Sequence, residues 1–216
     1  NRSRRDYIRL DQAMQQLFKL SHRVTLHLID GLFDERYADS DVVDIQYEDN
    51  RFVTSSGQRL QGDLHLALRL HDRVCRYHIE FQTLSDRSMA IRMFRYGMEK
   101  ALQEAAAGAA GELTVEFPQQ LVIYLEENRN VPEMLSLRLK LTDGQQLHYS
   151  VPVFRYWTWT AEQLVQRGLY ALLPLQVFNA RVNLKRLDRS RQPEEFKRRS
   201  IEEQFQQLRE TVGKTL

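Results

Sequence analysis

Several features that define common protein classes are missing from this 216-residue sequence. Cys75 is its only cysteine, so the chain can form neither a disulfide framework nor a zinc site built from cysteines, which suits a reducing cytosol. No apolar run approaches the roughly eighteen residues that a membrane-spanning helix needs. The opening NRSRRDYIRL also lacks the apolar stretch of a signal peptide. We therefore expect a cytoplasmic protein with no membrane partner.

An excess of charge of one sign is missing as well. Lys and Arg together number 31 and Asp and Glu 29, which gives a formal net charge of only +2. This balance permits a nucleic-acid partner without indicating one, because passive nucleic-acid binders usually carry a bolder basic stripe. The sequence contains no phosphate-binding P-loop, no G-x-G-x-x-G and no G-x-S-x-G. It therefore offers neither a nucleotide-binding loop nor the nucleophile elbow of a serine hydrolase.

What the sequence does contain is a hydrophobic fraction of 42%, enough for a proper core, arranged in clear patterns. The order of helix, strands, helix, strand, hairpin and helix is typical of an α/β or α+β protein. The charged stretch from residue 184 onward divides the chain into a domain at 1–183 and a C-terminal helical segment at 184–216. The patterns predict helices at 6–37, 86–106 (capped by Ser85 or Asp86), 160–172 (capped by Thr160) and 194–212, with strands at 43–47, 51–54, 63–70, 74–82 and 119–125 and a hairpin turn at Asp143–Gly144.

Residues 63–82 carry the clearest pattern, a strict alternation of apolar and polar side chains in DLHLALRL and VCRYHIEFQ. Period-two alternation predicts two half-buried strands, and the short HDR between them suits a hairpin turn. Leucines at even positions of the first strand and apolar residues at odd positions of the second would face the core together. The remaining face would hold Asp63, His65, His78, Glu80 and Gln82.

Asp63 and Glu80 are the residues of this face that can carry chemistry. With the turn centred near residue 72, Asp63 would lie opposite or diagonal to Glu80 and Gln82, within about 5–7 Å. Two carboxylates with one further oxygen form a site suited to Mg²⁺ or Mn²⁺. Such a metal can bind a phosphate oxygen and activate water for phosphodiester hydrolysis. A polar strand face is more often simply solvated, so the alternation and spacing by themselves are not specific.

The block HIEFQT followed by DRSMAIRMFRYGMEKAL resembles the PD-(D/E)XK nuclease family transposases, the group that includes the recombination-promoting nucleases. Later blocks, among them FPQQLVIYLEENRNVPEMLSLRL and DGQQLHYSVPVFRYW, are similar too, so the resemblance covers about residues 20–180. It implies an α/β fold with a restriction-endonuclease-like core, a mixed β-sheet flanked by helices. It also implies a metal-dependent endonuclease that hydrolyses DNA with Mg²⁺ or Mn²⁺.

The resemblance implies a role for each site residue. Asp63 and Glu80 would be catalytic metal ligands, and the backbone carbonyl of Phe81 would be a further ligand. Gln82 stands where related nucleases carry a lysine, and it would position water or phosphate by hydrogen bonds. The substrate would be contacted by Arg92 and Tyr96, which lie one helical turn apart, and by His78. As alternatives, Tyr96 can be a core residue, Arg92 a salt-bridge partner, and His65 and His78 surface groups or a general base.

One departure from the family pattern leaves two functions open. The family resemblance implies a further acid near RFV at 51–53, where this sequence has Arg51. The chain is thus either an active endonuclease or a catalytically weakened nuclease fold that binds DNA or protein. RNA is a further alternative substrate, and cleavage of both strands would favour a homodimer with contacts in the charged C-terminal segment. The candidates for the missing acid are Glu48, Asp49, Asp30 and Glu35.

Overall fold

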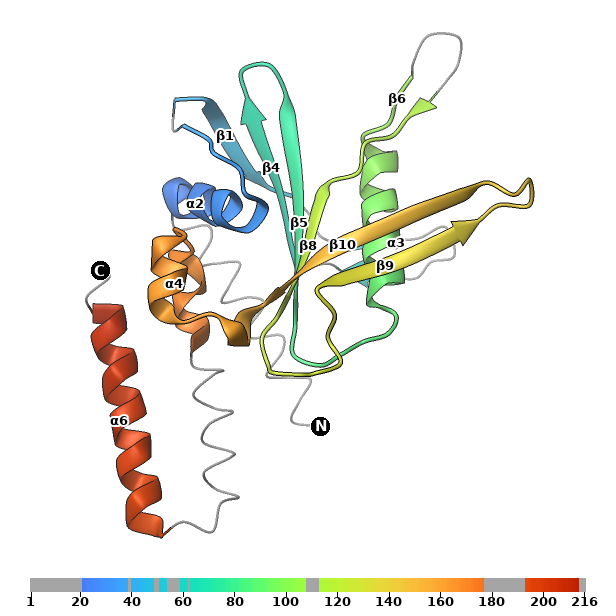
Figure 1. The fold of residues 1–216 in the computed structure, drawn as a ribbon. Coiled ribbons are helices and arrows are strands. Elements are labelled where there is room, and N and C mark those ends of the chain that lie inside the picture. Colours follow the sequence, from blue (N-terminus) through green and yellow to red (C-terminus); the bar gives the residue numbers. More distant parts are fainter. Residues whose placement is uncertain are drawn as a thin grey trace.

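The fold is built around a six-stranded mixed sheet flanked by helices (Figure 1). The computed structural model describes residues 21–38, 40–48, 51–53, 59–61, 63–107, 113–176 and 193–213. The strand order is β1–β4–β5–β8–β10–β9; β5 with β8 and β8 with β10 pair in parallel, and the other neighbours are antiparallel. The six strands are β1 (Val42–Tyr47), β4 (Leu64–Leu70), β5 (Val74–Gln82), β8 (Gln119–Tyr124), β9 (Met134–Lys140) and β10 (Gln146–Arg155).

Helices cover both faces of this sheet. On one side lie α2 (His22–Phe33), α4 (Ala161–Gln166) and η3 (Tyr170–Leu175), and on the other lies α3 (Met89–Gln103) (Figure 1). The α/β class with a mixed, helix-flanked sheet is thereby confirmed. The remaining elements are η2 (Tyr156–Thr158), α6 (Glu194–Gly213) and the two-stranded pairs β2 (Arg51–Val53) with β3 (Arg59–Gln61) and β6 (Ala106–Ala107) with β7 (Leu113–Thr114).

The β4–β5 hairpin forms as its alternation predicts, but it is not half-buried. Leu66 and Ile79 face α2 and are fully buried. His65 and His78, on the opposite face, are buried as well. The prediction of a half-buried hairpin was wrong because α3, which follows β5 in the chain, folds back over the polar face. Two faces packed against helices leave the central strands no solvated side.

The ends of α3 differ from the prediction. The helix runs from residue 89 to 103 instead of 86 to 106, and its N-cap is Ser88 instead of Ser85 or Asp86. Asp86 serves the preceding turn, because its carboxylate accepts the backbone N–H of Ser88 at 2.8 Å and its hydroxyl at 2.7 Å. An Asp that holds a turn in this way is unavailable to cap the helix.

The predicted helix at 160–172 is two shorter elements. Thr160 is the N-cap as predicted, and it forms a capping box with Gln163. The helix ends at Gln166, because Gly168 follows with a φ of 74° that reverses the chain before η3 begins. A backbone in the left-handed region cannot continue a right-handed helix.

The other predicted elements have simpler outcomes. The strand at 119–124, the hairpin turn at Asp143–Gly144 and the helix at 194–213 are present. Of the predicted helix at 6–37, the residues before 21 lie outside the described ranges; in the described part α2 begins after its N-cap Ser21 and ends at Phe33, because Asp34 adopts a left-handed backbone, so the predicted end at 37 was wrong. The boundary between residues 183 and 184 lies outside the described ranges too. No helix in the described part of the chain is long and apolar enough to cross a membrane.

Candidate functional site

Asp63 and Glu80 lie side by side where β4 begins and β5 ends. The hairpin register pairs Leu64 with Ile79, so the next opposed residues are Asp63 and Glu80. The backbone N–H of Asp63 donates to Glu80 Oε1 at 3.1 Å, and the N–H of Phe81 donates to Asp63 Oδ2 at 2.7 Å. Each carboxylate is therefore tied to the backbone of the other segment, and the structure brings the two predicted metal ligands together.

The backbone of β5 directs a carbonyl towards the same place. In an extended strand the N–H and C=O of one residue point to the same side. Because the Phe81 N–H points to Asp63, the Phe81 carbonyl points to that side as well. The Gln82 carbonyl points the other way and accepts the Leu125 N–H at 2.7 Å. Strand alternation places the half-buried Gln82 side chain on the face of Glu80.

Glu80 is only 1% exposed, so its carboxylate depends on neighbouring donors. The Nε2 atom of His78 lies 3.1 Å from Glu80 Oε1. The guanidinium of Arg92 lies 3.7 Å from Glu80 Oε2. The Asp63 N–H, the neutral His78 ring and the Arg92 cation thus surround the buried carboxylate, and a bound divalent cation would add further positive charge beside it.

Arg92 and Tyr96 lie one turn apart on α3, above the carboxylate pair. Arg92 is half-buried, lies 3.4 Å from the Tyr96 hydroxyl and forms a 3.3 Å ion pair with Asp86. Burial raises the pKa of Tyr96, and the negative charges of Glu80 and Asp63 raise it further. Tyr96 is thus a buried residue beside both acids. Arg92 lies near the site as predicted, and it is also a salt-bridge partner of Asp86, the alternative role.

His78 lies fully buried between α3 and the sheet. Its Nε2 faces Glu80, and its Nδ1 lies 2.9 Å from Gln120 Nε2. Burial, assisted by the charge of Arg92, lowers the pKa of His78 to about 3. A neutral ring with both nitrogens in hydrogen bonds favours a positioning role over the predicted contact with substrate. His65 stacks on this ring, with centroids 4.0 Å apart.

Gln120 is the neighbour of the site that sequence reasoning missed. Its Nε2 also donates to the Met93 carbonyl at 2.8 Å, and its Oε1 accepts the Tyr149 hydroxyl. A signal was present, because Gln120 is a polar residue at the head of the nearly continuous apolar strand QLVIYLE. In a strand covered on both faces, such a residue requires a buried partner.

The upstream acids lie elsewhere. Glu48 lies 3.0 Å from the Lys100 ammonium and 3.8 Å from Arg76, in a second charged cluster. On the α2 side, Asp30 accepts the Tyr37 N–H and Glu35 accepts from Gln119. Asp49 and the side chain of Arg51 lie outside the described residues. Within the described ranges, no group of three or more His, Cys, Asp or Glu is arranged to hold a metal ion.

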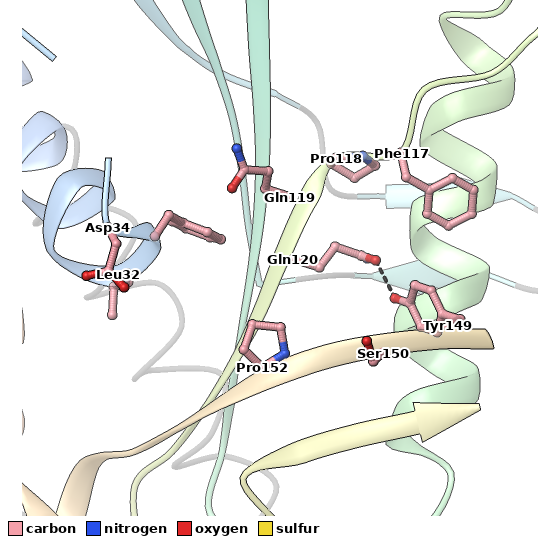
Figure 2. Close-up of a pocket in the computed structure, with 10 residues that line it drawn as sticks. Leu32, Asp34, Phe117, Pro118, Gln119, Gln120, Tyr149, Ser150 and Pro152 are labelled. Carbon is pink, nitrogen blue, oxygen red and sulfur yellow. Dashed lines mark hydrogen bonds between the residues drawn. The ribbon is translucent and has the colours of Figure 1, made fainter. Parts of the chain in front are cut away.

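A cleft of about 500 Å³ opens between β8 and β10 beside this network (Figure 2). The Val153 N–H donates towards β9, to the Glu133 carbonyl, so the nitrogen of Pro152 points to β8 without a hydrogen to donate. The parallel pairing of β10 with β8 begins only at Val153, and the strands diverge before it. The cleft is lined by Leu32, Phe33, Asp34, Phe117, Pro118, Gln119, Gln120, Tyr149, Ser150 and Pro152.

Comparisons with protein-family models, curated proteins and solved structures find no significant match to this chain. Its functional assignment therefore depends on the residues of the site and on the resemblance of its sequence motifs.

Proposed function

We propose that this chain is a Mg²⁺- or Mn²⁺-dependent endonuclease with a restriction-endonuclease-like core, similar to the PD-(D/E)XK transposase-like nucleases, that hydrolyses DNA phosphodiesters. The observation that supports it most is the carboxylate pair. Asp63 and Glu80 come from adjacent strand ends, each accepts a backbone N–H of the other segment, and the Phe81 carbonyl points to the same side. These oxygens are the ligand types that Mg²⁺ and Mn²⁺ prefer.

The donor set fits such a cation. Asp63, Glu80 and the Phe81 carbonyl would hold it, and water and substrate oxygens would complete its coordination, as is usual for Mg²⁺. When bound, the metal supplies charge stabilisation and an activated water. Gln82, on the face of Glu80, would orient the attacking water by hydrogen bonding. The guanidinium of Arg92, 3.7 Å from Glu80, could bind the phosphate.

Plasmid cleavage tests this proposal. We expect the wild-type chain to nick supercoiled plasmid with Mg²⁺ or Mn²⁺ and to be inactive in EDTA. Asp63→Asn and Glu80→Gln should each lose more than about 100-fold in rate, since even groups that only orient a ligand contribute roughly 10- to 100-fold. Asp72→Asn is the matched control, because it removes a carboxylate from the exposed turn of the same hairpin. Equal activity of all three variants would refute the assignment.

Two further measurements identify the nucleic acid that is cut and the oligomeric state of the protein. Digestion of DNA and RNA side by side identifies the nucleic acid, with DNA expected. Cutting both strands at one position favours two active centres, which we expect a homodimer to supply. Molar mass measured with and without a DNA duplex tests that expectation.

A second function is favoured by the position of Glu48. This upstream acid pairs with Lys100 at 3.0 Å and with Arg76 instead of with Asp63 and Glu80. A centre with two acids would suit a catalytically weakened nuclease fold that binds DNA or protein. Retarded migration of DNA in a gel, together with no cleavage by the wild type in Mg²⁺ or Mn²⁺, would support this function over the first.

A further inference from the structure

A chain of hydrogen bonds connects Tyr149, at the cleft between β8 and β10, to the buried carboxylate of Glu80. The Tyr149 hydroxyl donates to Gln120 Oε1, a contact drawn in Figure 2. The Nε2 of Gln120 lies 2.8 Å from the Met93 carbonyl and 2.9 Å from His78 Nδ1. The Nε2 of His78 lies 3.1 Å from Glu80 Oε1. Three contacts thus link four side chains beneath α3.

The chemistry of the partners fixes the direction of every proton in this chain. The Met93 carbonyl can only accept, so the atom of Gln120 facing it is the amide nitrogen. The second N–H of that nitrogen points at His78 Nδ1, which must therefore accept. The single ring proton of the neutral imidazole then resides on Nε2 and is donated to Glu80. An ionised Glu80 can only accept, so the far end of the chain independently requires the same tautomer.

Packing holds Gln120 in this orientation. Gln120 lies opposite His78 in the parallel register of β5 and β8, so the two side chains are neighbours on one face. Above them α3 approaches closely at Gly97, where an added Cβ would lie 3.0 Å from Gln120 Oε1. The hydroxyl of Tyr149 closes the remaining side of that oxygen. A flipped amide would place an N–H against the Tyr149 donor and an oxygen against the Met93 carbonyl.

We propose that Gln120 and Tyr149 are positioning residues that lock His78 in its Nε2–H tautomer and so fix the orientation of the Glu80 carboxylate. The tautomer does not depend on the function of the protein. Only its consequence, a carboxylate oriented to bind a divalent cation, rests on the proposed nuclease. The two parts are therefore measured separately.

The tautomer is measured by ¹⁵N NMR of the histidine rings in metal-free protein. We expect wild-type His78 to show a protonated Nε2 and an unprotonated Nδ1. Tyr149→Phe removes one hydroxyl, and Gln120→Met replaces the amide at similar length. Gln120→Met removes the donor to Nδ1 and should shift the His78 ring signals, that of Nδ1 most, and Tyr149→Phe should shift them less, because Glu80 still accepts from Nε2 in both variants. Gln119→Met, the same substitution one residue earlier and pointing to the other face, is the matched control and should leave them unchanged.

The consequence is measured as the affinity for Mn²⁺ alone by calorimetry. Removing a group that orients a ligand typically weakens metal binding 10- to 100-fold. Because Gln120 and Tyr149 act through His78, we expect about 10-fold for Gln120→Met and less for Tyr149→Phe. A thermal melt of each variant, followed by circular dichroism, separates this effect from unfolding.

Two results would overturn the positioning role. One is a wild-type His78 protonated on Nδ1, and the other is a Gln120→Met protein that keeps both the wild-type ring signals and the wild-type Mn²⁺ affinity. A wild-type protein that shows the expected tautomer but neither binds Mn²⁺ nor cleaves DNA would support the tautomer lock and overturn the proposed nuclease instead.

Discussion

The two faces of the six-stranded sheet bury different chemistry. The face covered by α2, α4 and η3 packs a continuous apolar cluster around residues such as Leu28, Leu66 and Ile123. The face covered by α3 buries polar groups beside its smaller apolar cluster. Among the described residues, the buried polar side chains on or beneath α3 are His65, His78, Glu80, Lys100 and Gln120, and the one on the other side is Thr25.

This difference suggests that the apolar face serves mainly stability and the polar face mainly function. Apolar burial stabilises a fold directly, whereas buried polar groups cost free energy unless every one is paired, and replacing such groups by apolar residues is often neutral or stabilising. A polar row crosses the sheet on the α3 face, from Glu48 beside His65 to His78 and Gln120. Its presence under a helix is hard to explain by stability, which directs attention to this face as the functional one.

Acidification should give the largest effect, through the two buried histidines of the polar face. Burial is the main reason that the pKa of His65 falls to about 2 and that of His78 to about 3, against 6.5 for an unperturbed histidine. Between pH 6.5 and pH 3 the two histidines therefore bind more protons in the unfolded chain than in the folded one. The free energy of unfolding is therefore at its full value above pH 6.5 and falls as the pH decreases towards 3.

Each histidine contributes a slope of about 1.4 kcal/mol per pH unit. The two together should lower the free energy of unfolding by up to about 5 kcal/mol between pH 6.5 and 4.5, measured by urea denaturation in EDTA. His78→Gln should remove about half of the slope. His71→Gln, at the exposed turn of the same hairpin, should leave it unchanged. A slope that survives loss of both buried histidines would contradict the assignment.

On the apolar face, Leu66→Ala is the substitution expected to destabilise the fold most. Leu66 is fully buried in the middle of β4, and its truncation leaves a cavity between the sheet and α2. We expect a loss of about 2–5 kcal/mol at neutral pH, with no change in the pH slope. Val43→Ala on β1 is the control, because Val43 is exposed and should contribute less than about 0.5 kcal/mol. A pH slope altered by Leu66→Ala would mean that the two faces are not independent.

The same comparison explains what the sequence could predict. Alternation in β4 and β5 assigned each side chain to the correct face, because strand parity is local. It could not reveal that the polar face is covered, since α3 is separated from the hairpin by a turn and its position is a tertiary property. Gln120 illustrates the same limit. Its partners His78, Met93 and Tyr149 come from three other elements, so no spacing in the sequence connects them.

Lys100→Met tests whether the charged cluster around Lys100 is independent of the carboxylate pair Asp63 and Glu80. The Lys100 ammonium lies 3.0 Å from Glu48 and 3.2 Å from Glu104, and it is nearly buried. Its removal should cost about 1–3 kcal/mol, since Arg76 still compensates both acids.

The affinity for Mn²⁺ should stay within about twofold of wild type in Lys100→Met if Glu48 belongs to the structural cluster alone, because a twofold change corresponds to only about 0.4 kcal/mol. Clearly tighter Mn²⁺ binding would instead identify Glu48 as the upstream acid of the metal site. Lys140→Met, on the exposed end of β9, controls for the loss of one positive charge.

The smallest loss of stability is expected for a glycine of α3, which we compare with a glycine of α2. A Cβ added at Gly31 of α2 would lie 2.6 Å from the Arg167 carbonyl oxygen, a backbone atom, and 2.6 Å from Leu169. A Cβ added at Gly97 of α3 would meet the Phe117 ring at 2.6 Å and the Gln120 amide oxygen at 3.0 Å. Backbone resists displacement more than the partly exposed ring of Phe117 does.

Gly31→Ala should therefore destabilise the fold by about 1–3 kcal/mol. Gly97→Ala should change stability by less than about 1 kcal/mol, because the better helix propensity of alanine offsets the strain. It should nonetheless displace Gln120 and move the ring signals of His78, which Gly31→Ala should leave in place. Thermal melts should therefore show a loss of stability mainly in Gly31→Ala, and ¹⁵N NMR should show altered His78 signals only in Gly97→Ala. The reverse result would mean that the two faces do not have separate roles in stability and in positioning Glu80.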